Sequence, residues 1–447
     1  MAMLRTGPAR GVLQLTTANG FGAVVATAQG VLVARWLGVT ELGLVGLIAS
    51  FPLLVVRLLS ADSNDLVVRY VGGFIGKGEG GKARALVRLA YGANLGLAVA
   101  GAAAVSAASP WIASAVLHDR GLWWVVVFHA ATLAIAATVD TSNGILSSLR
   151  EFRPLALLNA GMVVLRAGLV LGAAATWAGA TEVVLAQGAA AVAQSLLLLA
   201  VASLVLARRS GGRWTREPLS SLGDERAEVV RFLFYNKGED VLSTLSKRID
   251  LVLLGLFTTP ERVGYYQIAK TVATVPAYVA TPLYTVSLSY LSRYWHAGNW
   301  AATWRFIWQG AGMAGVPLAV GLLAVTWTFG EALFVWVLGQ GYAPAYAFLR
   351  TLLPMHAFAL LIFPFLPLTL VWGQLRFRFA WRVGLSVATV GGFLVVVPWA
   401  GALGMVWVMA AVNVTGTAVL VLWCLGPGRR AALASLGRRA GVEPASI

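Results

Sequence analysis

The sequence predicts an all-α polytopic membrane protein of about twelve transmembrane helices, arranged as two six-helix bundles around a central cavity. Hydrophobic residues fill 59% of the 447 positions and charged residues only 12%, which is far from the composition of a soluble domain. The apolar residues gather in runs of roughly 20, the length of a helix that crosses a bilayer. The longest hydrophilic stretch, 208–231, separates six such runs from six.

Each predicted span is an apolar run that ends at a short polar loop. The first is expected to be retained as a helix, because its apolar residues continue beyond the small residues Ala26 and Ala28 of a possible cleavage site. In chain order the spans lie near 11–34, 41–60, 86–106, 122–147, 155–178, 182–207, 232–257, 263–288, 305–328, 345–372, 383–400 and 402–424.

The positive charges predict how the spans are threaded. Of the 34 lysines and arginines, 24 lie in the N-terminal segment, the even-numbered loops and the C-terminal segment. The odd-numbered loops hold only Arg35, Arg120 and Arg262. Because positive residues stay on the cytoplasmic side, both termini are predicted to be cytoplasmic. The amphipathic stretch Asp62–Arg88 is expected to lie along the lipid headgroups on that side.

Charge and motif content exclude several classes of function. The net charge of +16 is spread over loops beside membrane helices, where topology and anionic lipids account for it, so we expect no nucleic-acid partner. The sequence has no phosphate-binding Gly-Lys-Ser/Thr loop and no clustered metal ligands, so no cofactor and no metal are predicted. The outer loops are too short to hold an acceptor and catalytic acids, so the chain is not expected to be an enzyme.

The halves on either side of 208–231 carry a weak internal repeat. Leu37–Gly43 resembles Phe257–Gly264 at an offset of 221 residues, about half of the chain. Paired six-span repeats are a recurrent plan of transporters, with the substrate between the halves. We therefore predict an N-terminal bundle over 1–207, a cytoplasmic hinge loop over 208–231, and a C-terminal bundle with a short basic tail over 232–447.

Charged residues inside the spans predict a binding site. A charge near the bilayer centre costs at least about 2.5–3.5 kcal/mol, so it is kept where it faces a wet cavity or a partner. The acids there, Asp140 and Asp250, are predicted to couple transport to an ion. They are outnumbered by cations, which predicts a cavity for an anionic substrate. The substrate-binding candidates are Arg166, Lys247, Arg248, Lys270 and Arg350.

Two other interpretations of these charges stay open. Arg166 with Asp140, or Lys247 with Asp250, would also be explained as ion pairs that only hold helices together. Arg57 and Lys237 lie near the cytoplasmic ends of their spans, where long side chains reach the headgroups, and they are assigned to that role.

Several short segments, in order, resemble the polysaccharide biosynthesis or O-antigen type oligosaccharide flippases of the multidrug/oligosaccharidyl-lipid/polysaccharide exporter superfamily. The resemblance covers nearly the whole chain. The peptidoglycan-precursor branch has more spans and has arginines within its first two, so the resemblance favours the polysaccharide branch. A proline expected near the end of the eighth span is absent from Ser287–Ser292. The segments are Arg35–Gly43, Leu66–Val71, Gly76–Gly78, Leu149–Arg153, Ile249–Gly255, Val263–Tyr266 and Leu338–Tyr342.

This resemblance implies a carrier in the bacterial cytoplasmic membrane. It would move an undecaprenyl-diphosphate-linked oligosaccharide between leaflets by alternating access, without ATP, driven by a proton or sodium gradient. Its partners would be the lipid-linked oligosaccharide, the bilayer and the coupling ion. A multidrug exporter of the same superfamily is the alternative, but its mostly cationic substrates would favour a cavity rich in acids. A membrane enzyme acting on lipid-linked sugars is a further alternative.

Overall fold

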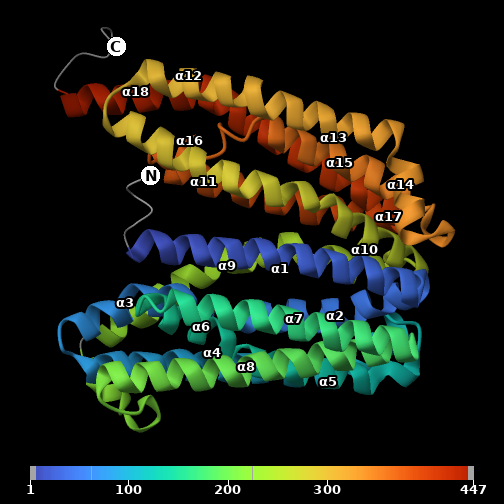
Figure 1. Ribbon diagram of the computed structural model, residues 1–447, viewed down its shortest axis with the longest axis horizontal. Coiled ribbons are helices and arrows are strands. Elements are labelled where there is room, and N and C mark those ends of the chain that lie inside the picture. The colour runs from blue at the N-terminus through green and yellow to red at the C-terminus, as the bar shows by residue number, and fades with distance from the viewer. Residues whose placement is uncertain (1–6, 62, 224, 441–447) are drawn as a thin grey trace. The chain divides into compact units, whose positions relative to one another are not determined.

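The computed structural model describes residues 7–61, 63–223 and 225–440, and over these ranges the chain is built from helices joined by short turns, with no β-strand (Figure 1). The chain forms two compact units, Met1–Gly264 and Tyr265–Ile447. The predicted all-α polytopic class is confirmed.

The first unit contains long helices that pack side by side, notably α1 with α7, α4 with α5, and α7 with α8 (Figure 1). A one-residue break at Ala137, whose φ of −60° and ψ of −20° remain helical, separates α5 from α6. The helices are α1 (Gly7–Leu37), α2 (Val39–Leu59), α3 (Asn64–Gly76), α4 (Gly80–Ala115), α5 (Trp123–Ala136), α6 (Thr138–Ser148), α7 (Phe152–Trp177), α8 (Ala180–Ser210) and α9 (Glu225–Phe257).

The second unit contains shorter and more broken helices. A π-helical turn, Ala311–Gly315, joins α12 to α13. The 51-residue α17 bends at Gly401, whose φ of 56° and ψ of −143° are not helical. The helices are α10 (Pro260–Ala273), which begins in the first unit, α11 (Val275–His296), α12 (Trp300–Gly310), α13 (Val316–Thr328), α14 (Gly330–Leu338), α15 (Ala345–Leu361), α16 (Leu368–Val371), α17 (Leu375–Leu425) and α18 (Pro427–Ala440).

Eight helical stretches in the described residues are long and apolar enough to cross a membrane. One of them, Leu375–Ala434, contains the two predicted spans 383–400 and 402–424, divided at the Gly401 bend. The predicted spans 232–257, 263–288 and 345–372 fall on α9, on α10 with α11, and on α15 with α16. These helices are more charged or shorter than the eight stretches, so length and composition alone do not identify them as membrane spans.

The first compact unit extends past the predicted hinge loop to Gly264, because α9 packs along α2. The two helices run antiparallel: Lys237 of α9 bonds to Arg57 near the end of α2, while Gly255 lies against Leu47 nearer its start. The division between compact units therefore falls after α9. The six-and-six division at 208–231 stays a prediction.

The segment that follows α8, which contains Glu217, is hydrogen-bonded to α4. The Arg84 guanidinium bonds to the Glu217 carboxylate at 2.8 Å, and Arg88 donates to the Glu217 carbonyl at 2.6 Å. Burial raises the pKa of the Glu217 carboxyl, but hydrogen bonds from Arg84 and Ser221 lower it more, so that the pKa lies below its ordinary value. Glu217 is therefore ionised at neutral pH and holds the segment on α4.

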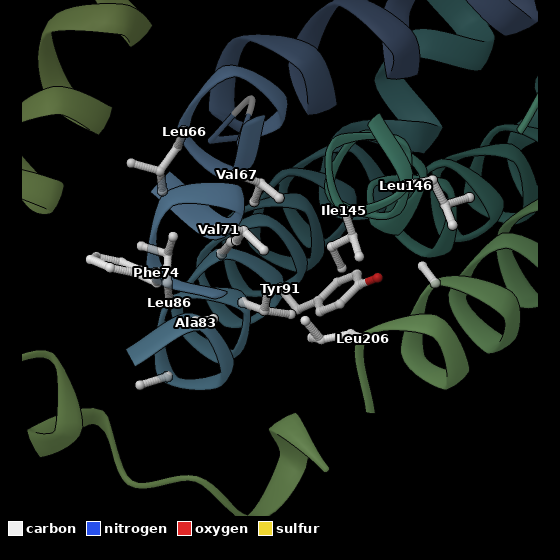
Figure 2. Packing of buried hydrophobic residues seen from close by; sticks show 14 of the residues in the cluster. Leu66, Val67, Val71, Phe74, Ala83, Leu86, Tyr91, Ile145, Leu146 and Leu206 are labelled. Atoms are coloured by element: carbon white, nitrogen blue, oxygen red, sulfur yellow. The ribbon is translucent and has the colours of Figure 1, made fainter. Parts of the chain in front are cut away.

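Helix α3 was expected at the lipid headgroups, and this expectation is wrong for its apolar face. Figure 2 shows Leu66, Val67 and Val71 inside a core with α4, α6 and α8, and all three are fully buried. Gly144 of α6 lies against Val67 and the Asn64 carbonyl, because a residue without a side chain lets two helices approach closely. The apolar stripe is therefore covered by protein.

The two segments of the predicted internal repeat pack against each other at the start of α2 and the start of α10. A Cβ on Gly43 would overlap the Pro260 carbonyl, and a Cβ on Gly264 would overlap the Val39 carbonyl. Val39 and Pro260 are separated by 221 residues, as are Gly43 and Gly264. The contact is therefore reciprocal: Gly43 lies against Pro260, and the equivalent residues Gly264 and Val39 lie against each other in the same way. This is expected for a local two-fold relation between duplicated segments.

Replacing Gly264 or Gly43 by alanine should destabilise the protein, because the added methyl group must push two helix ends apart. We expect a loss of about 1–3 kcal/mol, the usual cost of overpacking. The control is Gly168→Ala on α7, where a Cβ meets no atom within 4 Å and alanine favours the helix. Thermal unfolding of the purified protein in detergent measures the difference. Equal unfolding temperatures for Gly264→Ala and Gly168→Ala would contradict the close contact.

Candidate functional site

Charged residues of α2, α6 and α9 come together in the half of the first unit that is predicted to face the cytoplasm. Arg57 Nη1 lies 2.6 Å from Asp140 Oδ2, and Lys237 Nζ donates to the Arg57 carbonyl at 2.7 Å. Asn64 of α3 donates its amide to the Asp140 carbonyl at 3.3 Å. We refer to Arg57, Asp140 and Lys237 as the inner cluster.

Helix ends account for the placement of these charges. Arg57 is in the last turn of α2, where backbone carbonyls lack helical partners, and its carbonyl accepts from Lys237 and from the Ser60 hydroxyl at 3.1 Å. A cation suits this end of a helix dipole. Asp140 is in the first turn of α6, the end that suits an anion. Asp140 therefore follows the break at Ala137 directly, in the first turn of α6.

A buried hydrogen-bond network fixes α6 beside the inner cluster. Asn94 of α4, which is 1% exposed, accepts from the Ala61 amide at 2.8 Å and donates to Ser63 at 2.7 Å and to Thr141 at 3.1 Å. The Ser63 and Thr141 hydroxyls bond to each other at 2.7 Å. Thr141 follows Asp140 in the chain, so this network sets the position of the carboxylate.

A second buried pair continues this support along α6. The Tyr91 hydroxyl of α4 and the Ser142 hydroxyl lie 2.8 Å apart, and Ser142 also donates to the Thr138 carbonyl at 2.9 Å. By contrast, the side chains of Arg57 and Asp140 are 42% and 22% exposed. The charged side chains of Arg57 and Asp140 are thus accessible to solvent, whereas the hydrogen bonds that support them are buried.

The predicted pairing of Arg166 with Asp140 is not formed, because Asp140 pairs with Arg57. Arg166 lies midway along α7 and is exposed. Its charge acts on His129 of α5, a side chain that is 7% exposed and whose Nδ1 has no hydrogen-bond partner. Arg166 is therefore separate from the inner cluster.

The predicted residues of α9 lie on different faces. Asp250 is 1% exposed, whereas Arg248, two positions earlier, is exposed. Since two positions correspond to about 200° around a helix, the two side chains point to opposite sides. The side chain of Lys247 lies outside the described residues. Arg248 thus faces outward from the packed side of α9.

The two remaining predicted cations belong to the second unit. Lys270 Nζ lies 5.7 Å from the centre of the Tyr266 ring, one helical turn earlier in α10, within the range of a cation–π contact. Arg350, the sixth residue of α15, lines a cavity of about 860 Å³ formed with α13 and α14. The predicted cations are thus distributed over α7, α9, α10 and α15.

The sequence predicts Asp140 as a site residue but does not predict the contacts that Arg57 and Lys237 make. Both lie near the ends of their spans, and from the sequence this position favours contact with the headgroups. The charges inside the spans predict a site, and the one partner considered for Asp140 is Arg166. The partner depends on which helix ends meet, and that is decided by the packing of α2 with α9 and of α3 with α6.

The fold is that of transporters of the MOP superfamily. The lipid II flippase MurJ in an inward closed conformation aligns with a TM-score of 0.73, covering 95% of this chain and 91% of that chain at 12% identity. An inward-facing multidrug resistance transporter of the MATE family aligns with a TM-score of 0.66, over 90% and 93% of the two chains at 16% identity. A MOP superfamily transporter from Pyrococcus furiosus aligns with a TM-score of 0.61, over 96% and 97% at 18% identity.

The family model for polysaccharide biosynthesis proteins matches residues 9–295, and the chain belongs to this family. A search of curated proteins gave no match. The matched residues include the whole inner cluster.

The Arg57–Asp140 pair should be a measurable ion pair. A double-mutant cycle with Arg57→Gln, Asp140→Asn and the double variant should give a coupling free energy of unfolding of about 0.2–1 kcal/mol, because Arg57 is 42% exposed and solvent screens the pair. The same cycle on Arg209 and Glu151, whose side chains are 59% and 31% exposed, should give a smaller value. Zero coupling at Arg57 and Asp140 would contradict this contact.

Proposed function

We propose that this protein is a flippase that moves an undecaprenyl-diphosphate-linked oligosaccharide across the bacterial cytoplasmic membrane by alternating access. The observation that carries the proposal is the inner cluster, where Arg57 pairs with Asp140 and Lys237 donates to the Arg57 carbonyl within an apolar bundle. Guanidinium and ammonium groups donate charge-assisted hydrogen bonds to phosphate oxygens. A membrane protein of the polysaccharide biosynthesis family with such a cluster is suited to a lipid whose polar end is a diphosphate.

A multidrug exporter of the same superfamily is the second candidate, since several similar structures are MATE transporters. Cationic drugs would require a site in which carboxylates outnumber cations. The inner cluster has the opposite balance, with two cations and one carboxylate. Arg166 and Arg248, which lie apart from it on α7 and α9, are further cations of the same unit. The charge balance therefore favours an anionic substrate.

The substrate path in this proposal includes further cations. The inner cluster receives the diphosphate from the cytoplasmic leaflet, and the transport path is lined by Arg166, Lys247, Arg248 and Lys270. Arg350 contacts the substrate from the cavity formed by α13, α14 and α15. A charged lipid headgroup that leaves water needs several donors in succession, because an unpaired phosphate in an apolar bundle is costly. The number of cations along the spans matches this need.

Coupling in this proposal depends on competition for Arg57. When Asp140 is ionised, its carboxylate occupies the guanidinium. When Asp140 binds a proton or a sodium ion, its charge is neutralised and Arg57 can turn to the diphosphate. Release of the ion on the other side restores the pair and displaces the substrate. Asp250, which is 1% exposed, is the second candidate acid, because a buried carboxylate is costly unless it is neutralised or paired.

Transport in proteoliposomes tests this function. The probe is undecaprenyl-diphosphate-linked oligosaccharide extracted from bacterial membranes, and its movement is followed by protection from a membrane-impermeant glycosidase. Arg57→Gln should reduce the initial rate by at least about tenfold, since it removes a charge-assisted contact, and Arg57→Lys should recover part of it. Asp140→Asn should still bind the lipid but lose dependence on the imposed ion gradient.

Arg209→Gln, which alters a surface ion pair only, is the matched control and should transport at the wild-type rate. The Asp250→Asn variant distinguishes the two acids. Wild-type protein that moves cationic dyes but not the lipid would favour the drug exporter. Gradient-dependent transport that survives in both Asp140→Asn and Asp250→Asn would remove both acids from the coupling role.

The proposed orientation places both termini in the cytoplasm. Because Cys424 is the one cysteine in the chain, single cysteines can be introduced into a Cys424→Ala background. A membrane-impermeant maleimide applied to whole cells should label Thr259→Cys and leave Ser220→Cys unlabelled until the cells are broken; both positions are exposed. Labelling of Ser220→Cys in intact cells would reverse the orientation.

A further inference from the structure

The cavity that contains Arg350 differs in chemistry from the inner cluster. It lies between the last turn of α13, the helix α14, the turn Gln340–Tyr342 and the first turns of α15, all within the second unit. Its volume of about 860 Å³ is in the range of small-molecule sites. By the charge pattern of the loops, this end of the unit faces away from the cytoplasm. We call it the outer pocket.

The charges of the outer pocket balance. Its lining contains one carboxylate, Glu331, one guanidinium, Arg350, and the carboxamide of Gln340. The carboxylate accepts hydrogen bonds, the guanidinium donates them, and the carboxamide does both. A ligand rich in hydroxyl groups requires this combination, since each hydroxyl both donates and accepts. A diphosphate would be repelled by Glu331 and a cationic drug by Arg350. The polar lining therefore favours an uncharged polyhydroxyl ligand.

Aromatic side chains provide the rest of the lining. Trp327 and Trp336 are 49% and 77% exposed, so their ring faces are open to a ligand. An indole combines a large apolar face with one N–H donor, which matches the C–H face and hydroxyl edge of a sugar ring. Arg350 can also stack or hydrogen-bond through its planar group.

The pocket is built on a fixed wall. Tyr346 of α15 is 9% exposed, and its hydroxyl donates to the Thr326 carbonyl of α13, which ties the two helices together. Its ring contacts Phe334 of α14, with ring centroids 6.3 Å apart. Gly330 lies against the same ring, where a Cβ would come within 3.0 Å of the hydroxyl. Polar groups held on tied helices are positioned before a ligand arrives.

A tryptophan-rich end of a membrane helix is also expected where it anchors the chain at the bilayer surface. Anchoring requires no carboxylate, amide or cavity between the rings. The pocket at the corresponding end of the first unit has Trp111, Trp123 and Arg120 but no acid or amide among its lining residues, and its volume is smaller, about 590 Å³. The combination of Glu331 and Gln340 with the rings therefore distinguishes the outer pocket from an anchor.

We propose that the outer pocket binds one or more sugar units of the glycan carried by the lipid, after the glycan has reached the far side of the membrane. This inference rests on the proposed function and adds to it a separate saccharide subsite. The inner cluster would recognise the diphosphate, and the outer pocket the neutral part of the same molecule.

Saturation-transfer NMR on the full-length protein in nanodiscs tests the subsite. The probe is the oligosaccharide released from the extracted lipid by mild acid, so that neither diphosphate nor lipid contributes to binding. Trp336→Ala and Glu331→Gln should each weaken binding by about tenfold or more, the cost of losing a stacking face or a charged hydrogen-bond acceptor. Trp336→Phe keeps a ring and should recover most of the affinity, which separates contact with the sugar from misfolding.

The matched control is Trp399→Ala, which removes a 90% exposed tryptophan of the same unit that is not among the residues of the outer pocket, and it should bind as the wild type does. Inorganic diphosphate should not displace the oligosaccharide. Three results would each overturn the subsite. They are displacement of the oligosaccharide by diphosphate, absence of binding to the wild type, and binding by Trp336→Ala and Glu331→Gln that is as tight as that of the wild type. Transport of the intact lipid by the same wild-type sample would show that the proposed function stands without it, whereas absence of transport would contradict the function itself.

Discussion

The ion pair between Arg57 and Asp140 is the constraint on which the inner end of the first unit depends. A guanidinium and a carboxylate within an apolar bundle must be paired or hydrated, and here they are paired at 2.6 Å. The pair joins the end of α2 to the start of α6. Lys237 of α9 donates a hydrogen bond to the backbone carbonyl of Arg57. Because α9 packs along α2, the compact unit extends to Gly264.

The arrangement beneath the pair gives it two properties that usually conflict. The network around Asn94 is buried and hydrogen-bonded, so the backbone near Asp140 is held in place. The charged groups themselves are partly exposed, so an ion or an anionic ligand can reach them. Such a site is suited to the exchange of one bound ion or anionic ligand for another, because the ligand can change while the helices keep their positions.

The two units carry complementary chemistry in the function proposed here. The inner cluster has an excess of positive charge and suits a diphosphate, whereas the outer pocket has balanced charges and aromatic faces and suits sugars. A lipid-linked oligosaccharide contains both parts. Recognition divided in this way would allow one carrier to accept variation in the glycan while always holding the diphosphate.

The sequence by itself determined the class of the protein and most of its helices. Runs of about 20 apolar residues can satisfy their backbone polar groups inside a membrane only as helices, so the spans are readable without a structure. The offset of 221 residues also pointed to Gly43 and Gly264, although not to their mutual contact.

Only the tertiary structure decided which charges meet. The sequence predicts a coupling role for Asp140 and leaves Arg166 open as an ion-pair partner, and it assigns Arg57 and Lys237 to the headgroups. It also placed the apolar face of α3 at the membrane surface, whereas Gly144 lets α6 cover that face. Periodicity in a helix shows which residues share a face, but the neighbour of that face depends on packing between segments far apart in the chain. The pairing of Arg57 with Asp140 joins residues 83 positions apart, and no local pattern encodes it.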